Sequence, residues 1–444
     1  MLSRFGYLLV LVCAAAVFMP GAASADVSHG MKIDWSFPDG PVRTHSDLAF
    51  WGNIMVAGNY DGFRVFDLSQ TGVNRLLVSY LCRGPQNDSS LWGYNNKLYL
   101  FQSVDTPQTN GTTVCSQNRS SDTSACGPAC FEGIRIFDLT NPAAPVYIKG
   151  VYTDCGSHTH TLVPDLANNR LLLYVSSYPG SSGPNCPSPF RKFSIVQVPL
   201  DAPETASVLS QPPVNGGPPG CHDMTAFLQI NKMAAMCATE GQIWDITDPA
   251  NPDTTHPLRI DDAGVNYWHS AEFTWDGQYV VTNDESFTGT CQPSNDGKIR
   301  IWRVSDGQLM SSFMIPRPQG STYCSVHNGN IIPVVGRYLL VAAWYGGGTS
   351  VVDFTDPTNP REIAFYVGTG TSRQRADTWS SYWYNGKIYA NDISRGIDVF
   401  DLVLPNTPYG YPWAHLNPQT QEIMYPPPIG PMSALARLTS APAP

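Results

Sequence analysis

Charged residues are scarce in this chain, since Asp, Glu, Lys and Arg together make up 14% of its 444 residues. The net charge is −10 and Lys and Arg form no run, so the basic face of a nucleic-acid-binding protein is missing. Beyond the first 25 residues the chain has no apolar run of bilayer-spanning length, which predicts a mature chain without a transmembrane anchor. A P-loop, a GxSxG elbow and an HExxH helix are also missing, so no local motif names a reaction class.

Turn-forming and aromatic residues are plentiful instead. The chain has 38 Gly and 38 Pro, and aromatic residues make up 11% of it. Frequent turns between short, well-packed strands are typical of an all-β fold with many hairpins.

The first 25 residues have the features of a secretory signal peptide. Arg4 supplies the positive charge, residues 8–18 form a short apolar segment, and Ala23 and Ala25 frame a small-residue cleavage site. We therefore expect a mature chain that begins at Asp26 and is secreted, periplasmic or bound to the cell surface.

Removal of this segment also removes Cys13 and leaves an even number of cysteines. An even count in an exported chain favours disulfides, although spacing alone leaves their connectivity open. The ten remaining cysteines are Cys82, Cys115, Cys126, Cys130, Cys155, Cys186, Cys221, Cys237, Cys291 and Cys324. We expect most of them to be bridged.

A short pattern recurs seven times along the chain: an apolar residue, a polar residue that is usually Asp, and a second apolar residue. Seven copies about 50 to 70 residues apart indicate a propeller array with four antiparallel strands in each blade. Five copies are clear, at residues 66–68, 137–139, 244–246, 352–354 and 400–402. Two are degenerate, at residues 196–198 and 302–304.

The clearest copy, Gly-Ile-Arg-Ile-Phe-Asp-Leu-Thr-Asn-Pro at residues 133–142, resembles the LVIVD-repeat β-propellers. The segment Gly-Ile-Asp-Val-Phe-Asp-Leu at residues 396–402 reinforces the resemblance, which spans most of residues 40–402. It implies an exported or surface-associated propeller, and many members of this family have no assigned function.

The repeat divides the chain into a signal peptide at residues 1–25, one seven-bladed propeller at 26–402 and a tail at 403–444. The alternating residues 31–37 precede the first blade, and the last clear strand ends near Leu402. We predict that residues 31–37 pair with residues 397–402 and close the ring. The Pro-rich composition of the tail indicates an extended or mobile segment.

Histidines recur just before the first strand of several blades. In a propeller the first strand of each blade lines the central channel, so these side chains are expected around one channel mouth. They are His45, His160 (with His158 as the alternative in the same blade), His222, His269 and His327. Blades 2 and 7 have Asp88 and Thr378-Trp379 near that place. His29, His256 and His415 fall outside the register and are interpreted as surface residues.

Carboxylates in the turn between the second and third strands should return to the same mouth, because adjacent strands are antiparallel. They are Asp61, Glu132, Glu240 and Glu285. Imidazoles with carboxylates suit a divalent transition metal, whereas the structural alternative is that each imidazole bonds a neighbouring blade.

Three functions remain open from the sequence. The first is a binding or interaction module with an unknown small-molecule or protein ligand at the histidine- and acid-rimmed mouth. The second is a metal-dependent oxidase or hydrolase with histidine ligands on the propeller axis. The third is a purely structural surface protein.

Overall fold

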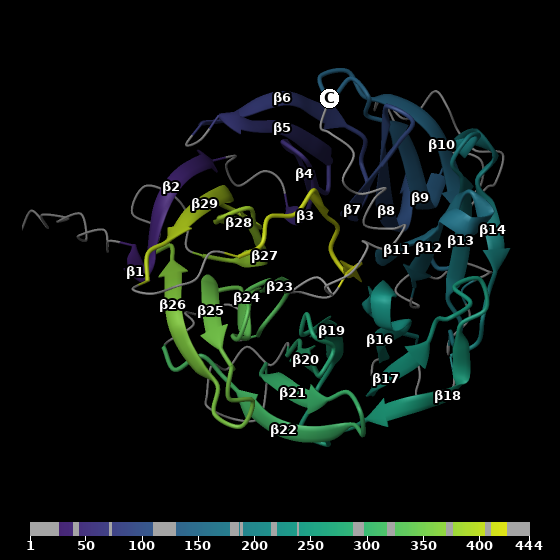
Figure 1. Ribbon diagram of the computed structural model, residues 1–444. Coiled ribbons are helices and arrows are strands. Elements are labelled where there is room, and N and C mark those ends of the chain that lie inside the picture. The colour runs from purple at the N-terminus through teal and green to yellow at the C-terminus, as the bar shows by residue number, and fades with distance from the viewer. Residues whose placement is uncertain are drawn as a thin grey trace, which may run out of the picture.

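Seven four-stranded antiparallel sheets form a closed ring, a seven-bladed β-propeller (Figure 1). The computed structural model describes residues 26–38, 44–70, 73–109, 130–177, 186, 190–214, 220–237, 239–286, 297–317, 325–369, 376–404 and 410–423. The predicted signal peptide at residues 1–25 lies outside these ranges. No helix in the described ranges is long and apolar enough to cross a membrane.

Each blade begins at the channel and ends at the rim. Blade 1 contains β3 (His45–Trp51), β4 (Ile54–Asn59), β5 (Gly62–Gln70) and β6 (Val73–Leu81). Blade 2 contains β7 (Gln86–Tyr94), β8 (Lys97–Thr109), β9 (Cys130–Asp138) and β10 (Val146–Tyr152). Blade 3 contains β11 (Thr159–Asp165), β12 (Arg170–Ser176), β13 (Ser194–Pro199) and β14 (Ser207–Ser210).

The second half of the ring repeats this order. Blade 4 contains β15 (Met224–Phe227), β16 (Lys232–Cys237), β17 (Glu240–Asp245) and β18 (Asp253–Ile260). Blade 5 contains β19 (Trp268–Phe273), β20 (Tyr279–Asp284), β21 (Ile299–Arg303) and β22 (Gln308–Phe313). Blade 6 contains β23 (Gly329–Ile332), β24 (Leu339–Ala343), β25 (Thr349–Asp353) and β26 (Arg361–Val367). Blade 7 contains β27 (Thr378–Tyr384), β28 (Lys387–Asp392), β29 (Gly396–Leu402) and β2 (Met31–Pro38).

Short elements complete the described chain. β1 (Val27–His29) extends blade 6 at its outer strand β26. The single 3-10 turns η2 (Leu166–Asn168), η3 (Pro203–Thr205) and η4 (Leu228–Ile230) lie between strands.

The repeated triplet lies on the third strand of every blade, or at its end, as the sequence predicts. In most of the clear copies the Asp accepts a hydrogen bond from the backbone N–H two residues later and so starts the turn that follows. Asp138 receives the N–H of Thr140 at 2.8 Å, and Asp245 receives that of Thr247 at 2.9 Å. A glycine begins several of these strands because a side chain would not fit: a Cβ at Gly62 would overlap the carbonyl oxygen of Tyr80.

The hydrophobic core lies between the faces of neighbouring blades. The first, apolar residue of the triplet contributes to it: Phe137 and Trp244 are fully buried. Trp244 stacks on Phe193 of the preceding blade with ring centroids 5.2 Å apart. A lone blade would leave these faces in water, so each blade depends on its neighbours for stability.

The ring closes as predicted. β2 pairs antiparallel with β29, from Met31 opposite Leu402 to Phe37 opposite Ile397. Blade 7 therefore takes three strands from one end of the propeller sequence and its outer strand from the other, which ties the two ends together.

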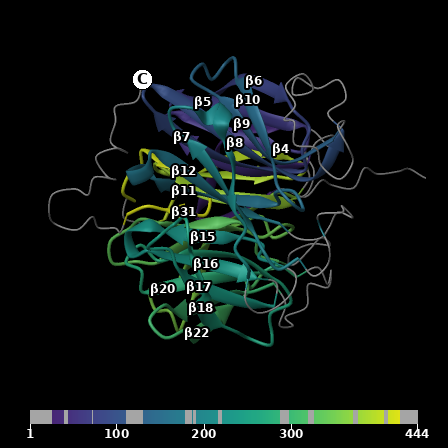
Figure 2. The same ribbon diagram turned by 90° about the vertical axis from the view of Figure 1, so that its right-hand side faces the viewer.

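The segment 410–423, which we call the C-terminal strap, runs across the middle of the ring (Figure 1). Its strand β30 (His415–Leu416) pairs with the inner strand β3, and β31 (Thr420–Gln421) pairs in parallel with the inner strand β15. Figure 2 shows β31 beside β15 and β11. The Pro-rich composition indicated an extended or mobile tail, and this part of it instead packs inside the propeller.

Two disulfides are present in the described chain, Cys155–Cys186 and Cys221–Cys237, and Cys82 is also disulfide-bonded. The bridge at Cys155 joins the segment before β11 to an insertion of the same blade. The expectation of an oxidised chain holds for these five cysteines. Cys115, Cys126, Cys291 and Cys324 lie outside the described residues.

Candidate metal site at the histidine mouth

Four imidazoles from four successive blades form a row where the inner strands of these blades begin. They are His158, His222, His269 and His327, which we call the histidine arc. Ring centroids are 4.4 Å apart between His158 and His222, 4.0 Å between His222 and His269, and 4.2 Å between His269 and His327. All four side chains are buried. The convergence that the repeat position predicts therefore holds for His222, His269 and His327.

Hydrogen bonds between blades fix which histidine of each blade reaches the arc. The residue after one arc histidine bonds to the backbone carbonyl of the next: Thr159 Oγ1 donates to His222, and the Asp223 N–H donates to His269. These hydrogen bonds set the position of each blade relative to the next and place His158 beside His222. The sequence favoured His160, which lies two residues farther along the chain, inside β11, and contacts Ser90 and Ser103 instead of the arc.

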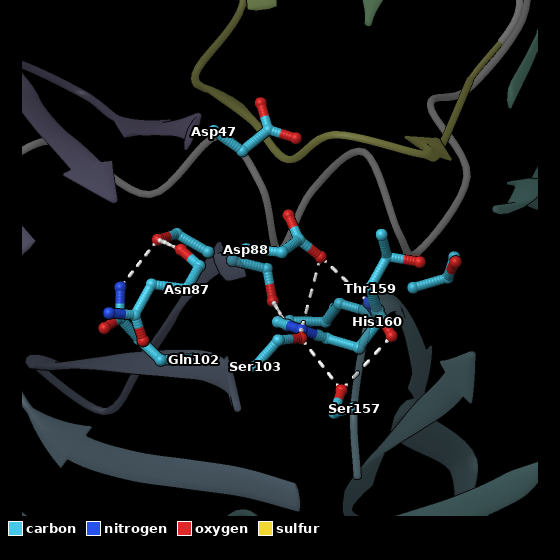
Figure 3. Close-up of polar contacts among 12 residues, drawn as sticks. Asp47, Asn87, Asp88, Gln102, Ser103, Ser157, Thr159 and His160 are labelled. Atoms are coloured by element: carbon cyan, nitrogen blue, oxygen red, sulfur yellow. Dashed lines mark hydrogen bonds and ion pairs between the residues drawn. The ribbon is translucent and has the colours of Figure 1, made fainter. Parts of the chain in front are cut away.

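His160 has a different environment from the arc. Its Nε2 is 2.7 Å from Ser90 Oγ and its Nδ1 is 2.9 Å from Ser103 Oγ, so both ring nitrogens are engaged within the protein (Figure 3). Burial lowers the pKa of His160 to about 3, which keeps the ring neutral. These contacts match the structural alternative that the sequence left open, in which an imidazole joins neighbouring blades.

His45 is also placed away from the arc. It begins β3 in blade 1, where its backbone N–H donates to the carbonyl of Ile393 in blade 7.

Among the described residues, one group of possible metal ligands has its ligand atoms within 4.8 Å of one another. It consists of His222, His269 and Glu285.

Of the four predicted carboxylates, Glu285 reaches the arc. Its Oε2 lies 3.5 Å from His269 Nε2, and its Oε1 lies 3.7 Å from His327 Nε2. The hydroxyl of Tyr345 donates to Glu285 Oε1 at 2.5 Å. Burial raises the pKa of Glu285 to about 7, although the Tyr345 hydrogen bond acts in the opposite direction.

The other three carboxylates lie elsewhere on this end of the propeller. Asp61 is 3.7 Å from the guanidinium of Arg83, and Glu240 pairs with Arg259. Glu132 is buried on β9, where burial, followed by the charges of Asp105 and Asp154, raises its pKa to about 7.

Neighbouring acceptors orient two imidazoles of the arc. His327 Nδ1 lies 2.6 Å from the carbonyl oxygen of Trp379, and a carbonyl only accepts, so Nδ1 carries the proton. The Nε2 lone pair of the neutral ring therefore points towards Glu285. His222 Nδ1 is 2.9 Å from Asp223 Oδ1, the carboxylate–imidazole contact that commonly supports a metal-binding histidine.

His269, in the middle of the arc, is buried without a hydrogen bond. Its exposure is 0%, and among the described residues neither Nδ1 nor Nε2 has a hydrogen-bond partner. A buried polar group without a partner costs about 1–3 kcal/mol, so such a residue requires an explanation.

The electrostatics favour neutral imidazoles at His222, His269 and His327, but not at His158. Burial first, and then the neighbouring imidazoles, hold the pKa of His269 well below its usual value, and burial lowers the pKa of His327 to about 3. Burial also lowers the pKa of His158, but the Asp105 carboxylate, 3.3 Å from its Nδ1, outweighs this and the net shift is upward. Neutral imidazoles have the lone pairs that a transition metal binds.

Sequence reasoning missed several neighbours of the arc. His158 was the rejected alternative, and Asp105 on β8 lies far from any recurring motif. Tyr345 was an aromatic residue without an assigned position, Trp379 was placed near the histidine position of blade 7, and neither was predicted to contact His327. Their rings lie 4.9 Å and 4.6 Å from that of His327, and no local signal reveals this because the contacts cross from one blade to the next.

The histidines outside the register are placed in two ways. His29 and His256 are exposed, as expected. The interpretation of His415 as a surface residue is wrong: it stacks on Trp51 at 4.3 Å and bonds to Glu422.

A surface cavity of about 420 Å³ lies between blades 4 and 5, at the strand ends opposite the arc. Lys232 and Arg303 lie next to it and pair with Asp245 and Asp306.

Comparison with known proteins adds no function. No protein-family model matches the chain, and no curated protein matches it. Among solved structures it is similar to the computationally designed Ika8 protein, with 14% sequence identity and a TM-score of 0.45. That match covers 82% of this chain and 98% of the designed one.

Proposed function

We propose that this chain is an exported propeller of the LVIVD-repeat type that binds a ligand at its histidine mouth. We propose further that the ligand is a divalent transition-metal ion held by His222, His269 and Glu285, with His327 as the next ligand in reach. The observation that carries the proposal is His269, a fully buried imidazole with both nitrogens lacking a hydrogen-bond partner among the described residues.

The separations around Glu285 support a shared ion rather than hydrogen bonds. At 3.5 Å and 3.7 Å, the contacts from Glu285 to His269 and His327 are too long for strong hydrogen bonds. Two ligands on one tetrahedral zinc ion, each at about 2.0–2.1 Å, are about 3.4 Å apart. Small movements would therefore bring these atoms onto one ion.

The surroundings support the same reading. The outer nitrogens of His222 and His327 contact Asp223 and the carbonyl of Trp379, which are the groups that usually orient metal ligands. For export, the support is the signal-like N-terminal segment together with the disulfides, which persist in oxidising compartments.

Metal analysis of untagged protein tests the proposal. The protein would be produced in an oxidising compartment, stripped with a chelator, dialysed against ZnCl₂ and measured by elemental analysis and titration calorimetry. We expect one zinc ion per chain in the wild type and loss of that ion in His269→Ala. His256→Ala, an exposed histidine outside the arc, is the matched control and should keep the ion.

Circular dichroism would establish that each variant is folded. The proposal fails if the stripped wild type takes up no zinc, copper or nickel, or if folded His269→Ala binds as much metal as the wild type.

A further inference from the structure

Four carboxyl groups lie in the channel between the histidine arc and the C-terminal strap. They are Asp47, Asp88, Asp223 and Glu272, from blades 1, 2, 4 and 5, and we call them the acidic layer. All four are buried. Glu272 directly precedes Phe273, whose backbone bonds to Gln421 of the strap, and Asp223 directly follows His222. The layer therefore lies beneath the proposed transition-metal site.

The four groups are close enough to influence one another. Burial raises the pKa of Asp88 well above its usual value, and the charges of Asp47 and Asp223 add to the effect. The pKa of Glu272 is raised well above its usual value by burial and by the charges of Asp223 and Asp47. Four acidic groups thus share one low-dielectric space.

Among the described residues no Lys or Arg forms an ion pair with these four carboxyl groups, and the basic side chains that contact them are the imidazoles of His222, 2.9 Å from Asp223, and His160, 3.4 Å from Asp88. Asp47 accepts hydrogen bonds from the Leu48 N–H at 2.9 Å and from Asn328 at 3.0 Å. Asp88 Oδ2 accepts the N–H of His160 at 2.8 Å, as Figure 3 shows. These donors are neutral, so they reduce the cost of the buried charge without cancelling it.

Several oxygens around the layer have no hydrogen-bond partner among the described residues. They are Asp88 Oδ1, Asp223 Oδ2, Thr225 Oγ1 and Asn328 Oδ1, all on buried residues, and Asn328 contacts Asp47 directly. Three of these four atoms can only accept, and the hydroxyl of Thr225 can accept as well. What is missing is therefore a donor or a cation rather than another acceptor.

From these contacts we infer that the acidic layer is a second cation site, separate from the histidine arc, and that it takes Ca²⁺. Carboxylate, amide and hydroxyl oxygens are ligands of hard cations, whereas the nitrogen-rich arc suits a transition metal. Ca²⁺ accepts six to eight oxygens in irregular geometry, which fits groups from four separate blades, whereas Mg²⁺ requires a near-ideal octahedron.

Water completes this site. Among the described residues, the acidic layer does not form a group of three carboxylates within 4.8 Å of one another. The ion therefore binds one or two carboxylates directly and the rest through water molecules, as calcium sites commonly do.

Calcium titration of the stripped full chain tests the inference. We expect one Ca²⁺ per chain by calorimetry and a rise in Tm with about 5 mM CaCl₂, above the 10⁻⁴–10⁻³ M dissociation constants of many extracellular calcium modules. Both effects should be lost in Glu272→Gln, a change of nearly equal volume at a residue whose side chain makes no hydrogen bond among the described residues. Glu132→Gln is the matched control, since Glu132 is also buried and has an unpartnered carboxylate oxygen, Oε2, but lies outside the layer.

Two outcomes would overturn the inference. One is a wild type that gains no stability from CaCl₂ beyond that from NaCl of equal ionic strength, which would mean that protons neutralise the layer. The other is an undiminished calcium response in folded Glu272→Gln. Zinc uptake by Glu272→Gln and calcium binding by His269→Ala, both expected to be unchanged, separate a failure here from a failure of the transition-metal proposal.

Discussion

The two ends of the channel are built from the same seven inner strands, but individual polar side chains at the two ends differ in their partners. At the strap end, Asn417 bonds both the N–H and the carbonyl of Leu91, and Gln421 does the same with Phe273. At the histidine end His269 has no hydrogen-bond partner among the described residues. The side chain of Gln419 in the strap also lacks a partner among these residues, so the comparison is between the two amides that fasten the strap and the histidine that we propose binds a metal ion.

The largest expected effect comes from removing the aromatic anchor of the strap. The ring of Trp413 lies 5.3 Å from those of both Trp275 and Trp383. Trp413→Ala should lower the free energy of unfolding by about 3–5 kcal/mol, because it leaves a cavity among large rings. Urea denaturation measures this change.

Tyr411→Ala, at a more exposed ring of the same segment, should change stability by about 0.5 kcal/mol or less. The folded Trp413→Ala protein should still bind zinc. Equal stabilities of the Trp413 variant and the wild type would contradict a structural role for the strap.

The next largest effect is the stabilisation of the folded chain by zinc, which should depend on His269 and not on the strap. Zinc at 100 times its dissociation constant should stabilise the wild type by about 2.7 kcal/mol, because the ion binds only the folded chain. His269→Ala should gain nothing, whereas Trp413→Ala should gain as much as the wild type. Denaturation with and without zinc gives both differences, and an equal gain in His269→Ala would remove the contrast between the two ends.

A smaller effect is expected for one paired amide of the strap. Asn417→Ala leaves the buried N–H and carbonyl of Leu91 without their side-chain partner and should cost about 1–3 kcal/mol. Asn251→Ala, on an exposed turn, is the control and should be close to neutral. If the two variants unfold at the same urea concentration, the double pairing contributes little to stability.

An effect of similar size, confined to high pH, is expected at the histidine end. The folded pKa of Glu132 is raised from 4.5 to about 7, so the folded chain holds the proton more tightly than the unfolded chain. The stability from protonated Glu132 is therefore present below about pH 4.5 and is lost as the pH rises through 7. Glu132→Gln should escape this loss and should be more stable than the wild type by about 1–3 kcal/mol at pH 8 but not at pH 4.

Urea denaturation at both pH values measures the difference between the two proteins, in which the other titrating groups cancel. Glu204→Gln, at an exposed position, is the control variant for the same substitution. A Glu132 variant that is no more stable at pH 8 than at pH 4, relative to the wild type, would contradict the raised pKa.

The histidine pair of blade 3 shows a limit of prediction from the sequence. His158 directly precedes β11 and His160 is the second residue of that strand, so both lie near the repeat position and the pattern alone does not separate them. Which of the two histidines reaches the arc depends on the position of blade 3 relative to blade 4. The hydrogen bond from Thr159 to the carbonyl of His222 sets that position. That bond joins residues 63 positions apart and has no local signature.

By itself the sequence determined the seven-fold repeat, the third-strand triplets and the pairing of residues 31–37 with 397–402, because these follow from local alternation and turn chemistry. It also predicted that His222, His269 and His327 lie together, because they have the same position in successive repeats, although His45 has that position as well and lies away from the arc. Only the tertiary structure decided that Glu285 faces this arc, that Asp47, Asp88, Asp223 and Glu272 share one space, and that the strap crosses the channel. These are contacts between blades, and their distances depend on how the closed ring brings together residues that are far apart in the chain.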